Sequence, residues 1–104
     1  MSTLEDLDKS KIINLLKTNK DKLKKYYVKQ IGIFGSFSRG ESTSKSDIDL
    51  LIEFEDGKKD YDNYIEVIFF LEKILQRDVD VVTFEALSPY MKSKIIEETH
   101  FEKF

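Results

Sequence analysis

Two neighbouring segments of this chain carry residue types that together could bind a nucleotide and a metal ion. Residues 35–40 read GSFSRG, and residues 46–50 read SDIDL. Glycine lets an anion approach backbone N–H groups, serine adds a hydroxyl donor, and arginine offers a fork of donors to phosphate. Two aspartates two positions apart on a strand project to the same side, where they can hold one or two Mg²⁺ ions. The pattern predicts chemistry on a polyphosphate.

Residues 35–42 are also one residue away from a Walker A phosphate-binding loop. Gly35, Gly40 and Ser42 have its spacing, but Glu41 stands where that loop has a lysine. A carboxylate there would repel phosphates, and the segment STSKSD that follows favours turns over the long helix of a Walker fold. We therefore reject the Walker A interpretation.

The residue types assign roles within the two segments. Gly35, Ser36 and Arg39 are predicted to bind the nucleotide, and Asp47 and Asp49 to bind the metal ion. The alternative for Arg39 is an exposed arginine paired with Glu41, and such a pair contributes little to stability.

Hydrophobic periodicity predicts the elements that position these residues. The expected elements are helix 2–27, in one piece or in two joined near Asn19, strand 29–34, strand 47–54, turn 55–59, helix 61–76, strand 78–84, and a helix within 87–99. In the last of these, Ser88 can cap the helix and Pro89 can occupy its first position. The fold class is α/β (α+β), with a short mixed sheet flanked by helices.

The same periodicity predicts which side chains form the core. Strand 47–54 alternates between an apolar face and a mostly acidic one. The apolar face holds Ile48, Leu50, Ile52 and Phe54, and the other holds Asp47, Asp49, Leu51 and Glu53. The core faces of the helices are Ile12, Leu16, Leu23 and Tyr27 in the first, and Tyr64, Ile68, Leu71 and Leu75 in helix 61–76.

Composition narrows the class of protein. The chain has 104 residues, which suits one domain over 1–104, and no apolar run nears the roughly 18 residues of a membrane span. The chain has no cysteine, which excludes disulfides and thiolate catalysis. Its one histidine, His100, leaves no basis for a histidine-centred triad. No signal peptide is visible, and we expect a cytoplasmic location with no membrane partner.

Charge is unevenly distributed along the chain. Lys and Arg outnumber Asp and Glu by 10 to 7 over residues 1–52, whereas acidic residues lead by 13 to 7 over residues 53–104. The net charge of −3 argues against a stable nucleic-acid partner. The lysine-rich segment 17–30 is predicted to be a solvated helix face, and the alternative is a docking surface for an acidic partner or RNA.

The joint spacing of the two segments resembles a known signature. Gly-Ser, ten intervening residues and then Asp-x-Asp is similar to the signature of the DNA polymerase β-like nucleotidyltransferase superfamily, and GSFSRGESTSKSDIDLLIEF resembles its minimal nucleotidyltransferase (MNT) group. VKQIGIFGS before it and RDVDVVTFEALSPYMKSKIIEE after it extend the likeness over essentially the whole chain. Ser38 departs from the pattern, because many relatives have alanine there.

The resemblance implies a third carboxylate on a neighbouring strand. The segment DVDVV offers Asp80 at the family position, with Asp78 on the same strand face as the alternative. Asp80 would complete the catalytic and metal-binding set with Asp47 and Asp49, and would act as general base toward the acceptor hydroxyl.

The resemblance further implies a function. It predicts Mg²⁺-dependent transfer of AMP from ATP to a hydroxyl, that of a tyrosine on a HEPN-type toxin, for which this chain would be the antitoxin. Two alternatives stay open: a binding-only antitoxin, and a free-standing nucleotidyltransferase acting on a small molecule. A homo-oligomer is possible.

Helix 61–76 carries two aromatic residues away from its apolar face. Phe69 and Phe70 project toward its polar side, which also holds Asp62, Glu66 and Lys73. Exposed phenyl rings are common at interfaces, so we expect at least one of them to contact a second protein, either another copy or the acceptor. The alternative is that the C-terminal HFEKF or another helix covers them.

Overall fold

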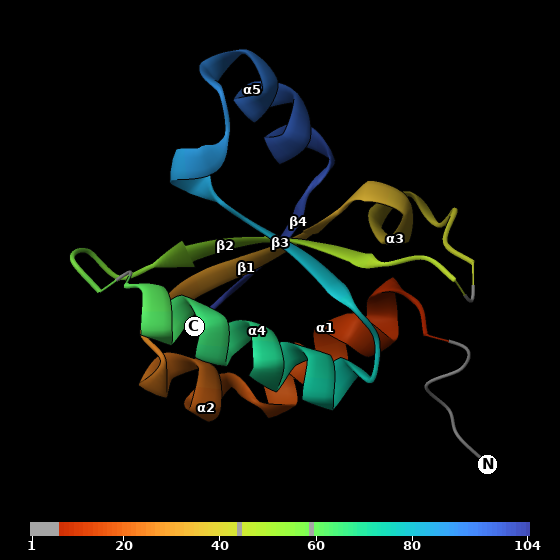
Figure 1. Ribbon diagram of the computed structural model, residues 1–104. Helices are drawn as coiled ribbons and strands as arrows, with labels where there is room; N and C mark the ends of the chain where they lie inside the picture. Colours follow the sequence, from red (N-terminus) through yellow and green to blue (C-terminus); the bar gives the residue numbers. More distant parts are fainter. Residues whose placement is uncertain (1–6, 44, 59) are drawn as a thin grey trace.

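The chain folds as a mixed sheet with helices on both sides, as the computed structural model shows for residues 7–43, 45–58 and 60–104 (Figure 1). The elements in chain order are α1 (Lys9–Thr18), α2 (Lys20–Lys25), β1 (Val28–Phe34), α3 (Gly35–Arg39), β2 (Ile48–Phe54), α4 (Tyr61–Leu75), β3 (Val79–Thr83), the 3₁₀ helix η2 (Phe84–Ala86), α5 (Pro89–Glu98) and β4 (His100–Lys103). This confirms the predicted α/β class. The part of the predicted first helix before residue 7 lies outside the described residues.

The sheet has the strand order β3-β2-β1-β4. β1 pairs antiparallel with β2 and with β4, whereas β2 and β3 run parallel. A parallel pair needs a crossover connection, and α4 supplies it between β2 and β3. The parallel pair brings the start of β3 beside the start of β2, and that juxtaposition matters for the site below.

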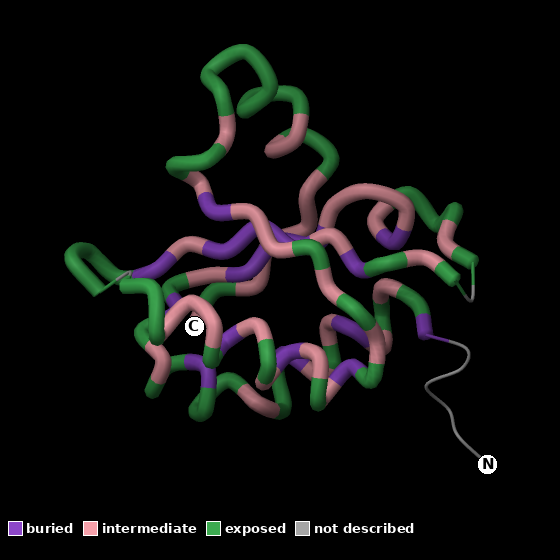
Figure 2. The backbone as a smooth tube through the Cα atoms, viewed as in Figure 1, coloured by how far each residue is buried: buried purple, intermediate pink, exposed green. Residues whose placement is uncertain are grey.

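Three helices cover one face of the sheet. In Figure 1, α1, α2 and α4 lie together on that face, and Figure 2 shows buried residues along their inner sides and along the strands. The inward side chains of β2 pack there, as its alternation predicts. The buried core includes Ile12, Leu16, Leu23, Ile31, Ile33, Phe37, Ile48, Leu50, Ile52, Val67, Leu71 and Leu75.

A smaller apolar cluster lies on the opposite face of the sheet. Leu51 is fully buried although it points away from the main core, and it is in register with Gly32 of β1, which is in register with Phe101 of β4. A Cβ on Gly32 would lie 2.8 Å from a Phe101 ring atom, so this close approach requires glycine. Phe101 stacks in turn on Phe84, with ring centroids 5.9 Å apart. This cluster brings together η2 and β4, the two elements that flank α5 in the chain.

The first helix is broken, as one of the two predicted alternatives had it. The Asn19 side chain donates to the Leu15 carbonyl at 2.8 Å, satisfying a carbonyl at the end of α1, and α2 starts at the next residue. The prediction of Tyr27 as a core residue is wrong. Tyr27 has a left-handed φ of 64° and is 46% exposed, while Tyr26 packs against the core instead. The helix ends before Tyr27, so helical spacing no longer applies to it.

Helix α4 begins and ends close to the predicted bounds. Asp60 caps it by accepting from the Asn63 backbone N–H at 2.7 Å, and Gln76 ends it in a left-handed conformation. Leu71 and Leu75 are buried as predicted, together with Val67, whereas Ile68 is only half-buried. The Tyr64 hydroxyl donates to the Val81 carbonyl at 3.1 Å and so fastens α4 to the edge strand β3.

Helix α5 confirms the predicted cap. The Ser88 hydroxyl accepts from the Met91 N–H at 3.3 Å, and Pro89 occupies the first position. The helix contains no buried residue and stands away from the sheet, opposite α1, α2 and α4 (Figures 1 and 2). None of the helices in the described part of the chain is long and apolar enough to cross a membrane.

Candidate functional site

Asp49 and Asp80 face each other across the parallel strands. The register of β2 and β3 pairs their Cα atoms, and both side chains project from the face opposite the main core, because Ile48 and Leu50 point into that core. Asp47 immediately precedes β2 and is exposed. The fold therefore brings the three predicted carboxylates to one edge of one sheet face.

The turn after β1 lies directly against these carboxylates. Phe34, the last residue of β1, is in register with Asp49, and the chain turns at Gly35 with a φ of +71°. A Cβ on Gly35 would lie 2.1 Å from Asp49 Oδ2. Glycine is therefore required at this position both for its backbone conformation and for the close contact.

The carboxylates influence one another electrostatically. The pKa of Asp49 is raised above its usual 3.8, chiefly because the group is partly buried, and then because Asp80 and Asp47 repel its negative charge. Arg39 acts in the opposite direction and favours the ionised form. A site of clustered like charges is one that a cation would stabilise.

Ser36 lies in the first turn of the short helix α3. Its side chain is half-buried, and its carbonyl accepts the Glu41 N–H at 2.9 Å, which closes the segment at Gly40 in a left-handed conformation. Phe34, at the N-cap, provides no side-chain acceptor for the first N–H groups of α3. The sequence patterns did not predict α3, because five residues are too few to show helical periodicity.

Arg39 pairs with two carboxylates in the structure. Its Nε donates to Glu41 Oε1 at 2.8 Å and its Nη1 to Glu98 Oε1 at 3.4 Å, and these contacts raise its pKa, with Glu41 the main cause. The pair with Glu41 is the alternative foreseen from the sequence. Arg39 is nevertheless close enough to Asp49 to affect its pKa, so it borders the carboxylate site.

Ser38 joins α3 to the far end of α5. Its hydroxyl donates to the Glu98 carbonyl at 2.5 Å, beside the pair that Arg39 forms with the Glu98 side chain. An alanine at this position could not make the bond. The sequence marked Ser38 as a departure from the family pattern but gave no sign of this contact.

Asp80 and Asp78 occupy different positions in the structure. Asp80 lies within β3 beside Asp49, whereas Asp78 precedes the strand and uses its carbonyl to accept from the Ile48 N–H at 3.1 Å. Of the two, Asp80 and not Asp78 affects the pKa of Asp49. The register thus places the predicted member of the pair beside Asp49.

Arg77 holds the loop that leads to Asp47. Its Nη1 donates to the carbonyls of Thr43 and Ser46, at 3.3 and 3.2 Å, and its guanidinium lies 5.5 Å from the ring centroid of Phe37. The sequence does not predict this contact of Arg77. A single arginine between a helix and a strand carries no pattern that points to a loop 31 residues earlier.

The residues present suit a hard divalent cation. Carboxylate oxygens are the ligands that Mg²⁺ prefers. Because Gly35 has no Cβ, its backbone can lie directly against the Asp49 carboxylate. No three acidic or histidine side chains in the described ranges are close enough together to hold a metal ion as they stand. The suitability of the site for Mg²⁺ therefore rests on two properties of Asp47, Asp49 and Asp80: their oxygen ligands and the mutual repulsion of their charges.

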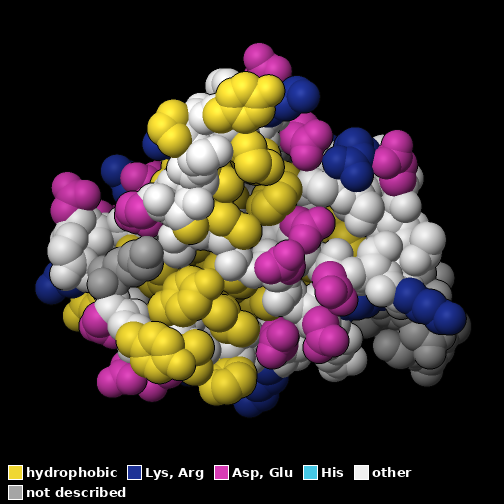
Figure 3. Space-filling view, turned by 45° about the horizontal axis from the view of Figure 1, so that its top comes forward, with side chains coloured by type: hydrophobic (Ala, Val, Ile, Leu, Met, Phe, Trp, Pro, Cys, Tyr) yellow, Lys and Arg dark blue, Asp and Glu magenta, His cyan; other side chains and the backbone are white. Residues whose placement is uncertain are grey.

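One face of the molecule carries acidic and apolar side chains next to each other. Figure 3 shows a group of acidic side chains at the middle of one face, next to a field of apolar side chains. The exposed apolar residues of α5, Tyr90 and Met91, are 89% and 52% accessible.

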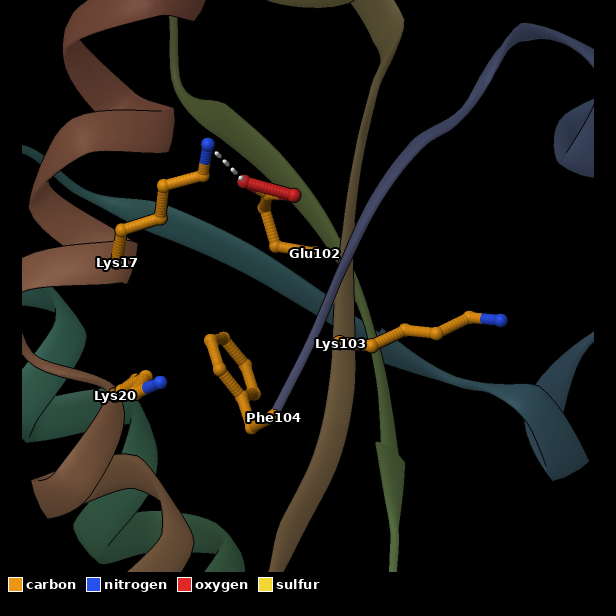
Figure 4. A pocket seen from close by; sticks show the side chains of 5 residues that line it. All are labelled: Lys17, Lys20, Glu102, Lys103 and Phe104. Atoms are coloured by element: carbon orange, nitrogen blue, oxygen red, sulfur yellow. Dashed lines mark ion pairs between the residues drawn. The ribbon is translucent and has the colours of Figure 1, made fainter.

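A separate pocket lies at the other edge of the sheet, beside β4 (Figure 4). It is lined by Lys17, Lys20, Glu102, Lys103 and Phe104, and encloses about 320 Å³. Lys17 pairs with Glu102 at 3.4 Å, while Lys103 points away (Figure 4). The lysine-rich segment 17–30 contains the end of α1, the whole of α2 and the start of β1. It lies away from the three aspartates, which occupy the β2–β3 side of the sheet.

Comparison with known proteins identifies the family. Residues 12–101 match the sequence profile described as the nucleotidyltransferase domain. A candidate protein adenylyltransferase of Methanocaldococcus jannaschii is 44% identical over 92 residues, covering 86% of this chain and 92% of the relative. The protein adenylyltransferase MntA of Thermococcus cleftensis is 32% identical over 99 residues, covering 94% of each chain.

Solved structures agree with the sequence relatives. A candidate minimal nucleotidyltransferase is similar with a TM-score of 0.73 and 27% identity, covering 95% of both chains. A toxin–antitoxin complex with AMP-PNP gives a TM-score of 0.64 at 28% identity, over 91% of this chain and 72% of that one. A complex of tri-AMPylated Shewanella oneidensis HEPN toxin with MNT antitoxin gives 0.55 at 26%, over 93% and 70%. The chain belongs to the nucleotidyltransferase domain family, in agreement with its resemblance to the minimal nucleotidyltransferases.

Proposed function

We propose that this chain is a protein adenylyltransferase that moves AMP from ATP to a tyrosine hydroxyl of a HEPN-type toxin and thereby acts as its antitoxin. The observation that carries the proposal is the pairing of Asp49 with Asp80 under the Gly35 turn. Carboxylates gathered against a phosphate-binding turn suit nucleotidyl transfer, and a protein that only binds has no need of them.

The relatives support the protein as acceptor. Two proteins similar to this chain over most of its length bear the name protein adenylyltransferase, and one similar solved complex joins an AMPylated HEPN toxin to an MNT antitoxin. On this likeness, the acceptor hydroxyl would arrive on another protein.

Each site residue has a role that follows from its position. The backbone of Gly35 and the hydroxyl of Ser36 would contact the triphosphate, and Arg39 would exchange its carboxylate partners for phosphate oxygens. Asp47, Asp49 and Asp80 would hold one or two Mg²⁺ ions, which supply positive charge to the phosphates. Bringing the reactants together in line contributes much of the rate.

The transfer forms one O–P bond and breaks another. The tyrosine oxygen attacks the α-phosphorus of ATP, the new bond is O–P, and the bond from that phosphorus to the bridging oxygen of pyrophosphate breaks. The hydroxyl proton passes to Asp80, which is exposed on the sheet face and free to return it to water. The products are the AMP-modified tyrosine and pyrophosphate.

Mass spectrometry of both chains tests the proposal. The chain is incubated with ATP, Mg²⁺ and a candidate HEPN-type toxin, such as the product of an adjacent gene, and each chain is weighed. We expect the toxin to gain the mass of one or more AMP groups. Nucleotide binding with neutralisation but without added mass would instead identify a binding-only antitoxin. Absence of both nucleotide binding and transfer would reject the enzymatic proposal.

A further inference from the structure

The outward side of α4 presents a stripe of exposed residues that the proposed catalytic site does not use. Glu66, Phe69 and Lys73 lie on it, opposite the buried Val67, Leu71 and Leu75. Phe69 is 66% exposed, which is a large apolar area to leave in water. Phe70 follows the alternative, because its ring is covered: it packs against the core, with its centroid 5.8 Å from that of Tyr26 at the end of α2.

A groove borders this stripe between α2 and α4. Tyr26, Phe70 and Ile74 provide its apolar lining, and it encloses about 420 Å³. Lys22 of α2 and the stripe residues Glu66, Phe69 and Lys73 complete its wall. An apolar floor with charged residues on its rim is the composition of a protein interface.

The order of charges along the stripe is self-complementary. Glu66 lies three positions before Phe69, and Lys73 lies three positions after Phe70. Two copies of α4 packed antiparallel, with a two-fold axis at the level of Phe69 and Phe70, therefore place Glu66 of each copy opposite Lys73 of the other. A parallel arrangement would instead place like charges together, which is unfavourable.

Neither Glu66 nor Lys73 is paired within the part of the chain that the structure describes. Glu66 and Lys73 have no ion-pair partner among the described residues. They are seven residues apart on one helix, or about 10.5 Å along its axis, too far to pair with each other. A second copy supplies the partner for both at once.

We propose that two copies of this chain associate through α4 about a two-fold axis, with Phe69 of each copy at the centre and the Glu66–Lys73 pairs on either side. The arrangement leaves both catalytic faces open, because Asp49 and Asp80 project from the face of the sheet opposite α4. The inference goes beyond the proposed function and does not depend on it.

Charge reversal tests the inference with the intact chain. By sedimentation, we expect the wild type to approach twice its 12.2 kDa mass as its concentration rises. Glu66→Lys and Lys73→Glu each place like charges opposite one another, so each variant alone should self-associate about ten-fold more weakly. Phe69→Ser should weaken association as well, whereas Tyr90→Ser, at an 89% exposed aromatic on α5, should leave it unchanged.

Mixing the two charge variants gives the decisive result. A heterodimer of Glu66→Lys with Lys73→Glu contains both opposite-charge pairs, so the mixture should associate about ten-fold more tightly than either variant alone. The double variant E66K/K73E should also regain the wild-type association. Thermal unfolding checks that each chain is folded, because these exposed positions should shift the melting temperature little.

Three outcomes would overturn the inference. One is a wild type that stays monomeric at all accessible concentrations, and another is a pair of charge variants that self-associate as tightly as the wild type. The third is a mixture that associates no more than its components, which would exclude pairing of Glu66 with Lys73 across a two-fold axis.

Discussion

Gly35 and Asp49 are in such close contact that any side chain at position 35 would collide with the Asp49 carboxylate. A Cβ there would lie 2.1 Å from Asp49 Oδ2, and the backbone has a φ of +71°. The turn and the carboxylate are therefore parts of one structure, although the sequence separates them by fourteen residues. This contact links the predicted nucleotide-binding segment to the predicted metal-binding segment.

Replacing Gly35 by alanine tests that contact. Gly35→Ala should displace Asp49 and abolish both nucleotide binding and transfer, in addition to a backbone cost of about 1 kcal/mol for the left-handed conformation. Gly57→Ala is a matched control, because Gly57 has a φ of +72° with no atom within 4 Å of a Cβ. The control should lose the same ~1 kcal/mol of unfolding free energy and keep nucleotide binding. Equal effects of the two variants on binding would contradict the prediction.

Substitutions of Asp80 and Asp78 provide a second test with a matched control. Asp80→Asn should lower AMP transfer by at least about a hundred-fold, because it removes a carboxylate proposed both to hold the metal ion and to accept the proton. Asp78→Asn should leave transfer nearly unchanged, since Asp78 contributes a backbone carbonyl, which the substitution preserves. Single-turnover transfer rates at saturating ATP measure both. A larger loss in Asp78→Asn would show that the wrong member of the pair was chosen.

The raised pKa of Asp49 predicts a pH-dependent gain of stability in Asp49→Asn. Burial and the neighbouring carboxylates disfavour the ionised form in the folded state, so the wild type is destabilised at any pH above that raised pKa. Below the ordinary value of 3.8 the group is protonated in both states and the cost disappears. The variant should therefore melt at a higher temperature than the wild type at neutral pH, and the difference should vanish as the pH falls below 3.8.

Melting curves from neutral to acidic pH in EDTA measure this difference without interference from divalent cations. A variant that is less stable than the wild type at neutral pH would contradict the predicted sign. Mg²⁺ should raise the melting temperature of the wild type more than that of the variant, because a ligand that binds the folded state stabilises it.

The local elements could be predicted from the sequence, but several of the contacts between them could not. The alternation of Ile48 and Leu50 with Asp49 predicts the two faces of β2. Successive side chains of a strand point to opposite faces, so an apolar face in the core places Asp49 on the other one. The caps Asp60 and Ser88 also carry strong local signals, although only Ser88 was predicted. Register across β2 and β3 is a long-range property, so the pairing of Asp49 with Asp80 came from family resemblance.

The features that were missed are short or depend on tertiary contacts. β4 has four residues, and its mixed polar and apolar sequence gives no clear alternation, so its pairing with β1 decides its structure. Tyr27 follows the helical spacing and yet lies outside the helix, because the chain turns there in a left-handed conformation. The contacts of Ser38 and Arg77 cross between elements far apart in the sequence, and no local pattern records them.

Two substitutions distinguish a role of Arg39 in nucleotide binding from a role in a surface ion pair. Arg39→Ala removes both the guanidinium and its pair with Glu41, whereas Glu41→Gln removes the pair and leaves the guanidinium in place. If Arg39 contacts phosphate, Arg39→Ala should weaken ATP binding roughly ten-fold or more, as expected for the loss of a charged hydrogen bond. Glu41→Gln should keep or improve binding, because Glu41 no longer competes for the donors of Arg39. Both variants should unfold within a few degrees of the wild type, since exposed ion pairs contribute little. Calorimetric titration with a non-hydrolysable ATP analogue measures the affinities, and unchanged affinity in Arg39→Ala would leave Arg39 as a partner of Glu41 and Glu98 alone.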